Sequence, residues 1–387
     1  MMEDIKRGVA EIIVEEEFWK LLSSGRKLRL KQGFDPSRPD IHLGHVVGLR
    51  KLKKFQKLGH KVILIVGDWT ARIGDPSGMS QTRPMLSEEE VKRNAETYMK
   101  QFFRIVDPEK TEVRWQSEWY DKFGLKDIIE LTSKFTVARL MAREDFAKRR
   151  EEGKPIALTE LIYPILQAYD SVAIDADVEF GGIDQKFNCL IGRELQEMMG
   201  KKPQQIFLMP LLVGTDGKLK MSKSYGNYIG IEEHPRDMYG KIMSIPDHLI
   251  ISYFELLTDV PLDEVKERLS KGENPMNLKK ELALEIVSEF WGREKALDAQ
   301  DYFETVFQRR GVPQDIPEVF IDLDDVADMF ELLVKIGASP SKSQAKRLIE
   351  GGAVEIDGEV IKGREAKIRD GAVIRVGKRK FIRLRRG

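Results

Sequence analysis

The almost wholly apolar hexapeptide KVILIV, at residues 61–66, restricts the possible folds of this chain more than any other sequence feature. A strand without a polar face is expected where helices cover both faces of a parallel sheet. The flanking segments favour the same arrangement: residues 28–34 and 111–116 have strand character, and residues 42–58 and 88–104 have the apolar periodicity of helices. This β-α-β-α-β alternation predicts an α/β fold with a doubly wound parallel sheet, whose ligands lie beyond the carboxyl ends of the strands.

The rest of the chain shows three further kinds of segment. Residues 125–172 are mostly helical in pattern and interrupt the sheet, which resumes as strand–helix–strand at residues 177–208. Residues 235–307 show helical patterns with little strand signal, and residues 308–322 contain two prolines and predict a linker. The segment from residue 323 onward combines two short helices with short alternating strands.

Composition excludes several classes of protein. The 387 residues include one cysteine, Cys189, which excludes a disulfide scaffold and a cysteine-based zinc ribbon and fits a reducing compartment. No apolar run reaches the 18 residues of a membrane span, and the first 19 residues lack an export signal. We therefore expect a cytoplasmic protein with no membrane contact.

Charge is unevenly distributed, although 64 Lys and Arg balance 64 Asp and Glu overall. From Lys335 to the C-terminus there are 15 basic and 6 acidic residues. A basic terminal module on an acidic body predicts contact with nucleic acid at one end of the chain. A solvated basic tail is the alternative, but the regular apolar positions of this segment favour a folded module.

Two histidines stand where the first predicted helix follows the first predicted strand. The tetrapeptide HLGH at residues 42–45 places two imidazoles at a helix N-terminus, where the amide groups and the helix dipole favour an anion. Gly44 has no Cβ and would let a base or ribose approach the backbone. A phosphate site is one interpretation. The other is a surface or metal-binding pair of histidines, although no cysteine cluster is present to complete a metal site.

A second cationic feature lies in the polar loop at residues 214–227. Lys220 and Lys223, three residues apart in KMSKS, would form a mobile clamp, and the alternative is an ordinary solvated loop. The combination with HLGH is much more specific than either motif. The chain lacks G-x-x-x-x-G-K-[ST] and G-x-G-x-x-G, which excludes P-loop and dinucleotide-binding sites.

With both motifs present, the sequence resembles the class I aminoacyl-tRNA synthetases, whose HIGH and KMSKS signatures match residues 42–45 and 220–224. Within that class it resembles the bacterial tyrosyl-tRNA synthetases, from about residue 30 to the end. Further matching segments are GFDPSRPDIHLGH (33–45), IGDPSG (73–78), YPILQAYD (163–170) and GGIDQKFN (181–188). The last 55 or so residues resemble an S4 RNA-binding module.

The resemblance implies a domain organisation and a set of partners. It implies a Rossmann-like catalytic domain over residues 1–230 with a helical insertion at about 117–175, an α-helical anticodon-binding domain with linker over 231–322, and a small α+β S4-like domain over 323–387. It also implies a homodimer joined through the insertion, with tRNA(Tyr), L-tyrosine and ATP as partners. ATP is expected as a substrate accompanied by Mg²⁺, with no tightly bound cofactor and no separate metal site.

Tyr163, Gln167 and Asp170 are spaced four and three residues apart and therefore share one face of a predicted helix. An aromatic ring, an amide and a carboxylate on one face suit a small zwitterion that carries a hydroxyl group. Without the surrounding motifs, a core aromatic and a helix-face charge are the alternatives. The resemblance implies that Tyr163, Gln167 and Asp75 hold the amino group of tyrosine and that Asp170 accepts the phenol hydrogen bond.

The resemblance also places the remaining site residues. It implies that Asp184 binds the ATP ribose hydroxyls and that Gln185 lies near the substrate carboxylate. The full expected sets are His42, His45, Lys220 and Lys223 for catalysis; Asp35, Ser37, Gly44, Arg83, Gly182, Asp184 and Lys223 for ATP; and Thr70, Asp75, Tyr163, Gln167, Asp170 and Gln185 for tyrosine. Three positions depart from the family pattern: Lys31 replaces a tyrosine that often shares the phenol hydroxyl, Met79 replaces a residue that is often basic, and Ser37 replaces a threonine.

These assignments predict a tyrosine–tRNA ligase that needs no general base in its first step. The carboxylate of tyrosine would attack the α-phosphate of ATP, and a ribose hydroxyl of the terminal adenosine of the tRNA would then attack the adenylate. The nearest alternative is a tryptophanyl-tRNA synthetase. A nucleotidyltransferase of the HxGH type and an RNA-binding protein on an inactive synthetase scaffold are the others. The S4-like tail, the QAYD carboxylate and the two intact signatures favour the tyrosyl assignment.

Overall fold

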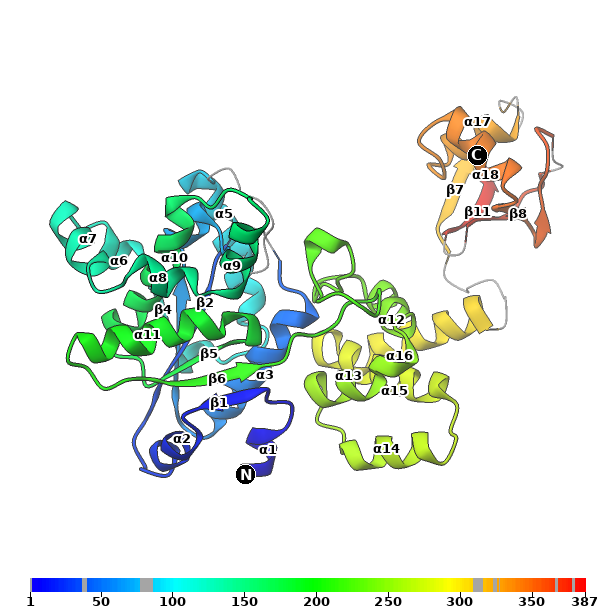
Figure 1. The fold of residues 1–387 in the computed structure, drawn as a ribbon. Helices are drawn as coiled ribbons and strands as arrows, with labels where there is room; N and C mark the ends of the chain where they lie inside the picture. The colour runs from blue at the N-terminus through cyan, green and yellow to red at the C-terminus, as the bar shows by residue number, and fades with distance from the viewer. Residues whose placement is uncertain are drawn as a thin grey trace. The chain divides into compact units, whose positions relative to one another are not determined.

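The computed structural model describes residues 2–36, 40–76, 86–308, 316–322, 326, 328–365, 368–377 and 380–387 (Figure 1). Contacts between residues divide the chain into two compact units, residues 1–293 and residues 294–387. The domain boundaries predicted near residues 230 and 322 each fall inside one of these units, so the three-part division stays a prediction. Within the described residues, no helix is both long and apolar enough to cross a membrane.

A six-stranded sheet forms the centre of the first unit. Its strands are β1 (Glu11–Ile13), β2 (Arg29–Phe34), β3 (Lys61–Val66), β4 (Thr111–Trp115), β5 (Val178–Gly182) and β6 (Gln205–Met209), in the order β1-β6-β5-β2-β3-β4. All neighbouring strands are parallel except β1 and β6, which run antiparallel at one edge. The predicted doubly wound parallel sheet is confirmed, and β2, β3 and β4 match the predicted strands to within one residue.

The strand order reverses between β2 and β5, and the helices that follow these two strands cover opposite faces of the sheet. After β2 comes α3 (Leu43–Lys57), whose Phe55 ring lies 5.7 Å from Phe207 of β6. After β5 comes α11 (Lys186–Met198), whose Cys189 packs with Ile206 of the same strand β6. Successive residues of a strand point to opposite faces. A ligand-binding crevice is therefore expected beyond the carboxyl ends of β2 and β5.

Helices enclose this sheet and explain why β3 has no polar face. The remaining helices around it are α1 (Met2–Lys6), α2 (Glu15–Leu22), α4 (Thr70–Ile73), α5 (Glu88–Phe102), α6 (Ser117–Tyr120), α7 (Leu125–Thr132), α8 (Val137–Met141), α9 (Glu144–Glu151) and α10 (Leu158–Ala173). Helices α6 to α10 form the expected helical insertion between β4 and β5. Ile63 and Ile65 of β3 pack with Leu166 of α10. Full burial of such a side chain contributes about 1.5–3 kcal/mol.

A helical segment follows the sheet within the same unit. It contains α12 (Pro235–Met243), α13 (Ile250–Leu257), α14 (Leu262–Ser270) and α15 (Pro275–Trp291). Arg50 of α3 forms ion pairs with Glu289 of α15 and with Asp259, the latter at 3.1 Å. The hydroxyl of Tyr253 in α13 donates to the carbonyl of Val213 over 2.7 Å. These contacts explain why the sheet and the helical segment form one compact unit.

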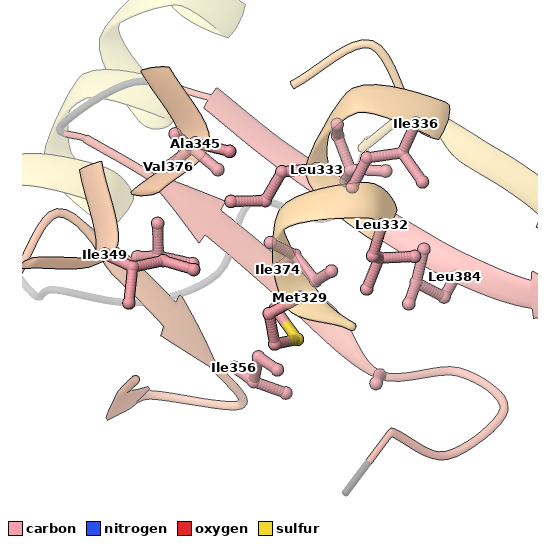
Figure 2. Close-up of a cluster of buried hydrophobic side chains, with 13 residues drawn as sticks. Met329, Leu332, Leu333, Ile336, Ala345, Ile349, Ile356, Ile374, Val376 and Leu384 are labelled. Atoms are coloured by element: carbon pink, nitrogen blue, oxygen red, sulfur yellow. The ribbon is translucent and has the colours of Figure 1, made fainter. Parts of the chain in front are cut away.

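The second unit has an apolar core of its own. After α16 (Arg293–Phe303) its elements are β7 (Glu318–Ile321), α17 (Met329–Lys335), α18 (Lys342–Glu350), β8 (Val354–Ile356), β9 (Glu359–Val360), β10 (Val373–Val376) and β11 (Lys380–Arg386), with the sheet order β7-β11-β10-β8-β9. Figure 2 shows Leu332 of α17 and Ile349 of α18 gathered with Ile374 of β10 in this core. The predicted pair of helices with short strands, an α+β module, is confirmed.

Candidate active site in the crevice of the sheet

Two adjoining cavities open at the carboxyl ends of β2 and β5. The first, which we call the histidine cavity, has a volume of about 340 Å³, and its lining includes His42, Gly44, His45, Asp184 and Lys220. The second, the carboxylate cavity, has a volume of about 300 Å³, and its lining includes Asp35, Thr70, Asp75, Gln116, Tyr163, Gln167 and Asp170. The walls that both cavities share are Gln32, His45, Tyr98, Gly181, Gly182 and Gln185. The two cavities are thus two chambers of one cleft.

The two histidines of HLGH cap the first turn of α3. The Gly44 N–H donates to Nδ1 of His42 over 3.2 Å, and the His42 N–H donates to Nδ1 of His45 over 3.2 Å. The Leu43 N–H donates to the carbonyl of Ile229 over 2.9 Å. Protein acceptors therefore occupy these amides in the described structure, and anion binding at this helix terminus stays a prediction. Since each Nδ1 accepts a hydrogen bond, each neutral ring carries its proton on Nε2 and presents an N–H donor there.

Both imidazoles are neutral at physiological pH. Burial is the main cause that lowers the pKa of His42 to about 2 and the pKa of His45 to about 4, and the positive charge of Lys223 adds to both shifts. The two ring centroids lie 3.9 Å apart. A Cβ on Gly44 would lie 3.0 Å from the ring of His42, so glycine at this position makes room for the capping imidazole.

The KMSKS loop forms one wall of the histidine cavity. Lys220 lines the cavity, and its Nζ lies 2.7 Å from Oδ2 of Asp184. The Nζ of Lys223 lies 3.2 Å from Oδ2 of Asp40. Lys223 is not among the residues that line the cavity, yet its charge lowers the pKa of both histidines. The structure therefore brings the four predicted catalytic side chains to one chamber and its rim, with both lysines paired to carboxylates.

Asp35 follows β2 and accepts two hydrogen bonds inside the carboxylate cavity. The Thr70 hydroxyl donates to its Oδ1 and the Tyr163 hydroxyl to its Oδ2, each over 2.7 Å. Burial raises the pKa of Asp35 to about 7. A Cβ on Gly67 would collide with Oδ1 of Asp35, so glycine is required for this close approach. Asp35 is expected among the ATP residues, and the structure places it instead with Thr70 and Tyr163 of the tyrosine set.

Asp170 of α10 lines the carboxylate cavity and has one buried oxygen without a hydrogen bond in the described part of the chain. Its Oδ2 accepts a hydrogen bond from Nε2 of Gln116 over 2.8 Å, whereas its buried Oδ1 has no hydrogen-bond partner among the described residues. Burial raises the pKa of Asp170 to about 7, and the charge of Lys31 opposes that shift. A buried oxygen without a donor costs free energy. The arrangement therefore suits a ligand that supplies one hydrogen-bond donor at this point.

Gln116 is absent from the predicted site, although its position at the end of a predicted strand could have indicated it. Its Oε1 accepts hydrogen bonds from the amide and the hydroxyl of Thr70, each over 3.0 Å, and its Nε2 binds Asp170. Gln116 thus holds two other residues of the cavity lining, Thr70 and Asp170. It is the last residue of the predicted strand 111–116, at the carboxyl end where ligands of parallel sheets lie.

A chain of amide side chains joins the rest of the tyrosine set. Nε2 of Gln185 donates to Oδ2 of Asp75 over 2.6 Å. Nδ2 of Asn188 donates to the Oε1 atoms of Gln185 and Gln167, each over 3.0 Å. Arg143, which precedes α9, donates to Oδ1 of Asn188 over 3.2 Å. Sequence reasoning missed Arg143, which lies outside the matching segments, and Asn188, which ends the matching segment GGIDQKFN but was given no role.

Three of the singled-out positions, Ser37, Met79 and Arg83, lie outside the described residues. Gly182, predicted for ATP, and Gln185, predicted for tyrosine, line both cavities. Within the described part of the chain, no group of three or more His, Cys, Asp or Glu side chains is arranged to hold a metal ion.

Two family models match the chain end to end from residue 23. Residues 23–308 match the tRNA synthetases class I (W and Y), and residues 309–387 match the tyrosine–tRNA ligase SYY-like C-terminal domain. A tyrosine–tRNA ligase of Dehalococcoides mccartyi (strain CBDB1) is 58% identical over 381 residues, which cover 97% of this chain and 96% of that protein. This chain belongs to the tyrosine–tRNA ligases. The ligase of Thermotoga maritima is 54% identical over 389 residues, covering 99% of this chain and 96% of that one.

Solved structures of tyrosyl-tRNA synthetases share the fold. The Archaeoglobus fulgidus enzyme, in complex with L-tyrosine, is 26% identical with a TM-score of 0.64, covering 77% of this chain and 98% of that chain. A C-terminally truncated mitochondrial enzyme of Aspergillus nidulans has a TM-score of 0.66 at 19% identity, covering 78% of this chain and 92% of that chain. Membership of the tyrosine–tRNA ligases sets aside the tryptophanyl, nucleotidyltransferase and RNA-binding alternatives.

We expect His42 and His45 to stay neutral between about pH 5.5 and pH 8, because burial holds both pKa values below this range. Their ring signals should therefore not shift with pH in NMR spectra of histidine-labelled protein, with each ring assigned from a His42→Asn or His45→Asn variant. A ring that titrates near the ordinary histidine value of about 6.5 would contradict the described burial.

Proposed function

We propose that this chain joins L-tyrosine to tRNA(Tyr) in two steps within the cleft. Tyrosine and ATP would first give tyrosyl-adenylate and pyrophosphate, and the terminal adenosine of the tRNA would then take the tyrosyl group and release AMP. One observation carries the proposal: a chamber with two N–H donors and a lysine adjoins a chamber with a buried, half-satisfied carboxylate. Membership of the ligase family supports the same reaction.

The carboxylate cavity is proposed to hold tyrosine. Oδ1 of Asp170 would accept the phenol hydrogen bond, while Gln116 keeps Oδ2 occupied. Asp75, Tyr163 and Gln167 would contact the amino group. Phenylalanine offers no hydroxyl, so it would leave Oδ1 buried and unpaired, and the free energy lost would discriminate against it.

The histidine cavity is proposed to hold ATP. The Nε2–H groups of His42 and His45 would donate to phosphate oxygens, Lys220 and Lys223 would balance the charge of the leaving pyrophosphate, and Asp184 would bind the ribose. The carboxylate of tyrosine is already a nucleophile, so a new bond to the α-phosphorus can form as the bond to pyrophosphate breaks, without a general base. These residues would act by positioning and charge stabilisation. Mg²⁺ would arrive with ATP, whose phosphate oxygens are the hard ligands it prefers.

We predict that Lys223→Ala slows tyrosine-dependent ATP–pyrophosphate exchange by about 10²–10³-fold, because it removes one group that stabilises charge in the transition state. The KM for tyrosine should change little, since Lys223 does not line the carboxylate cavity. Lys218→Ala is the matched control, because Lys218 is an exposed lysine of the same loop. An exchange rate equal to that of the control would refute the role of Lys223.

The helical segment α12 to α15 and the second unit are proposed to hold the tRNA, largely through phosphates and therefore in a salt-dependent way. The second unit has its own core, so its removal should leave the cleft intact.

We predict that deleting residues 309–387 leaves pyrophosphate exchange within about twofold and lowers kcat/KM for tRNA by more than about tenfold, since several phosphate contacts are lost. Equal loss of both activities would show that the module is needed for the catalytic fold.

The insertion is proposed to form a homodimer interface. Exposed apolar side chains gather on its helices: Leu125 and Ile129 on α7, Val137 on α8 and Leu158 at the start of α10. Exposed apolar groups in one region often mark an interface between proteins. We predict that Ile129→Glu converts a dimer to a monomer in sedimentation experiments, whereas Val360→Glu, at an exposed apolar residue of the second unit, does not. A monomeric wild-type chain would refute the proposal.

A cytoplasmic location is proposed as well. The single cysteine fits a reducing compartment, and the proposed tRNA substrate is used where proteins are made. Fractionation of the source cells checks this location, and recovery of the protein outside the cytoplasm would refute it.

A further inference from the structure

Lys31 of β2 is a fully buried lysine that stands where the tyrosyl family often has a tyrosine. Its side chain is 0% exposed. Glu179 of β5 lies directly opposite in the parallel register, and Nζ of Lys31 lies 2.9 Å from its Oε1. Neither residue lines the histidine cavity or the carboxylate cavity. The pair therefore sits behind the wall of the cleft rather than in it.

Protein groups use all three N–H bonds of the Lys31 ammonium. Besides the carboxylate of Glu179, it donates to the carbonyl of Gln167 and to the hydroxyl of Ser171, each over 2.8 Å. Lysine has three donors and no acceptor. Lys31 therefore has no donor left for the phenol hydroxyl of a substrate, which is the role of the tyrosine it replaces.

Glu179 is equally well satisfied. Its Oε1 also accepts a hydrogen bond from Nε2 of Gln167 over 3.1 Å, and its Oε2 accepts from the side chains of Ser171 and Gln204. A Cβ on Gly192 would lie 2.8 Å from Nε2 of Gln204, so the α11 backbone leaves room for this network. A buried pair with every hydrogen bond made is expensive to disturb, because removing one partner leaves an uncompensated charge.

The pair contacts the one turn of α10 that carries two substrate-binding groups, Gln167 and Asp170. Glu179 holds the Gln167 side-chain amide, and Lys31 binds the Gln167 carbonyl and Ser171, next to Asp170. Among the residues that the structure describes, the charged and titratable groups that face Asp170 are Lys31, Asp35, Tyr120 and Glu179. Among them Lys31 alone is cationic. Its charge favours the ionised carboxylate, while burial, Glu179 and Asp35 oppose ionisation.

We propose that Lys31 and Glu179 form a positioning pair for the amino acid, an inference that rests on the proposed function. Glu179 fixes the Gln167 amide for the amino group of tyrosine. Lys31, held on Ser171 next to Asp170, favours the ionised form of Asp170 as the acceptor for the phenol hydroxyl. Neither residue touches the substrate. The second partner of the hydroxyl in related enzymes is thus replaced here by a charge one layer deeper.

The test uses the full chain with Lys31→Met, Glu179→Gln and the double variant. Tyrosine-dependent pyrophosphate exchange is measured from about pH 6 to pH 9, with the KM for tyrosine, the KM for ATP, inhibition by phenylalanine and the melting temperature. Because the acceptor must be ionised, kcat/KM for tyrosine should rise with pH through the Asp170 pKa. We call this rise the acidic limb of the pH profile. Lys31→Met should shift the acidic limb to a pH about one unit higher and raise the KM for tyrosine about tenfold near neutral pH. The KM for ATP and inhibition by phenylalanine should stay within about twofold, since neither depends on the hydroxyl acceptor.

The double variant separates positioning from folding. It removes both charges, so it should recover the melting temperature, yet its acidic limb should remain above that of the wild type because Lys31 influences Asp170 more strongly than Glu179 does. Lys51→Met is the matched control: Lys51 is another buried lysine, held by the carbonyls of Ile5 and Arg7. Lys51→Met should lower the melting temperature and leave the acidic limb of the pH profile unchanged.

Two results would overturn the proposal. One is an unchanged limb and tyrosine KM in Lys31→Met. The other is a double variant in which both the melting temperature and the acidic side of the pH profile return fully to their wild-type values. The pair would then have a structural role only. If Lys31→Met does not fold, the double variant carries the test.

A further variant tests whether the coupling runs through Asp170. Asp170→Asn, introduced both into the wild-type chain and into the Lys31→Met variant, should abolish the difference in tyrosine affinity between the two. A difference that persists would also refute coupling through Asp170. A wild-type chain that shows no tyrosine-dependent exchange refutes the proposed function itself.

Discussion

The reversal of strand order between β2 and β5 is the constraint on which the whole site depends. Since α3 and α11 leave these strands toward opposite faces, neither helix covers the carboxyl ends between them, and the cleft opens there. The two sides of the cleft then receive different chemistry. The turn into α3 supplies neutral N–H donors, and α10 supplies a carboxylate and an amide. A phosphate compound and a hydroxylated amino acid can therefore meet at one shared wall.

The second constraint is the cost of burying charge beside that wall. Asp35 and Asp170 both have pKa values raised to about 7, mainly by burial, so an ionised form of either exists at neutral pH through its hydrogen bonds and neighbours. Hydroxyl and amide donors satisfy most of their oxygens. Lys31 provides a cation near Asp170 without entering the cavity. One buried oxygen of Asp170 is thereby left without a partner among the described residues, and the proposed selection of a single hydroxyl group depends on it.

Local pattern predicted much of this architecture, and the misses have a common physical cause. The apolar strand KVILIV, the helix entered at HLGH and the KMSKS loop are each specified within a few residues, so β3, α3 and the place of His42, His45 and Lys220 in one cavity were predictable. The Lys31–Glu179 pair was not, because it depends on the register between two strands that are far apart in sequence. Gln116, Asn188 and Arg143 likewise act through side-chain hydrogen bonds to distant segments.

The amides of the first α3 turn also show how far a local sequence pattern predicts the site. A helix N-terminus alone predicts free N–H donors for an anion. In this chain the ring of His42 accepts from the Gly44 amide, the ring of His45 accepts from the His42 amide, and the carbonyl of Ile229 accepts from the Leu43 amide. The two Nε2 atoms are then the donors that this turn presents. The hydrogen bonds within the motif therefore orient two neutral imidazole rings, and Gly44 leaves the space that the ring of His42 occupies.

The lysine pairs of the KMSKS region are consistent with a site that must exchange partners. Lys220 with Asp184 and Lys223 with Asp40 are partly exposed pairs at 2.7 and 3.2 Å. Pairs of this kind typically contribute about 0–1 kcal/mol each. A triphosphate with several negative charges competes readily with one carboxylate for each ammonium group. Its arrival would also release Asp184 for the ribose, so binding one substrate assembles the site that the reaction needs. The deeper Lys31–Glu179 pair is built in the opposite way, fully buried and fully hydrogen-bonded, as suits a charge that must stay in place through every turnover.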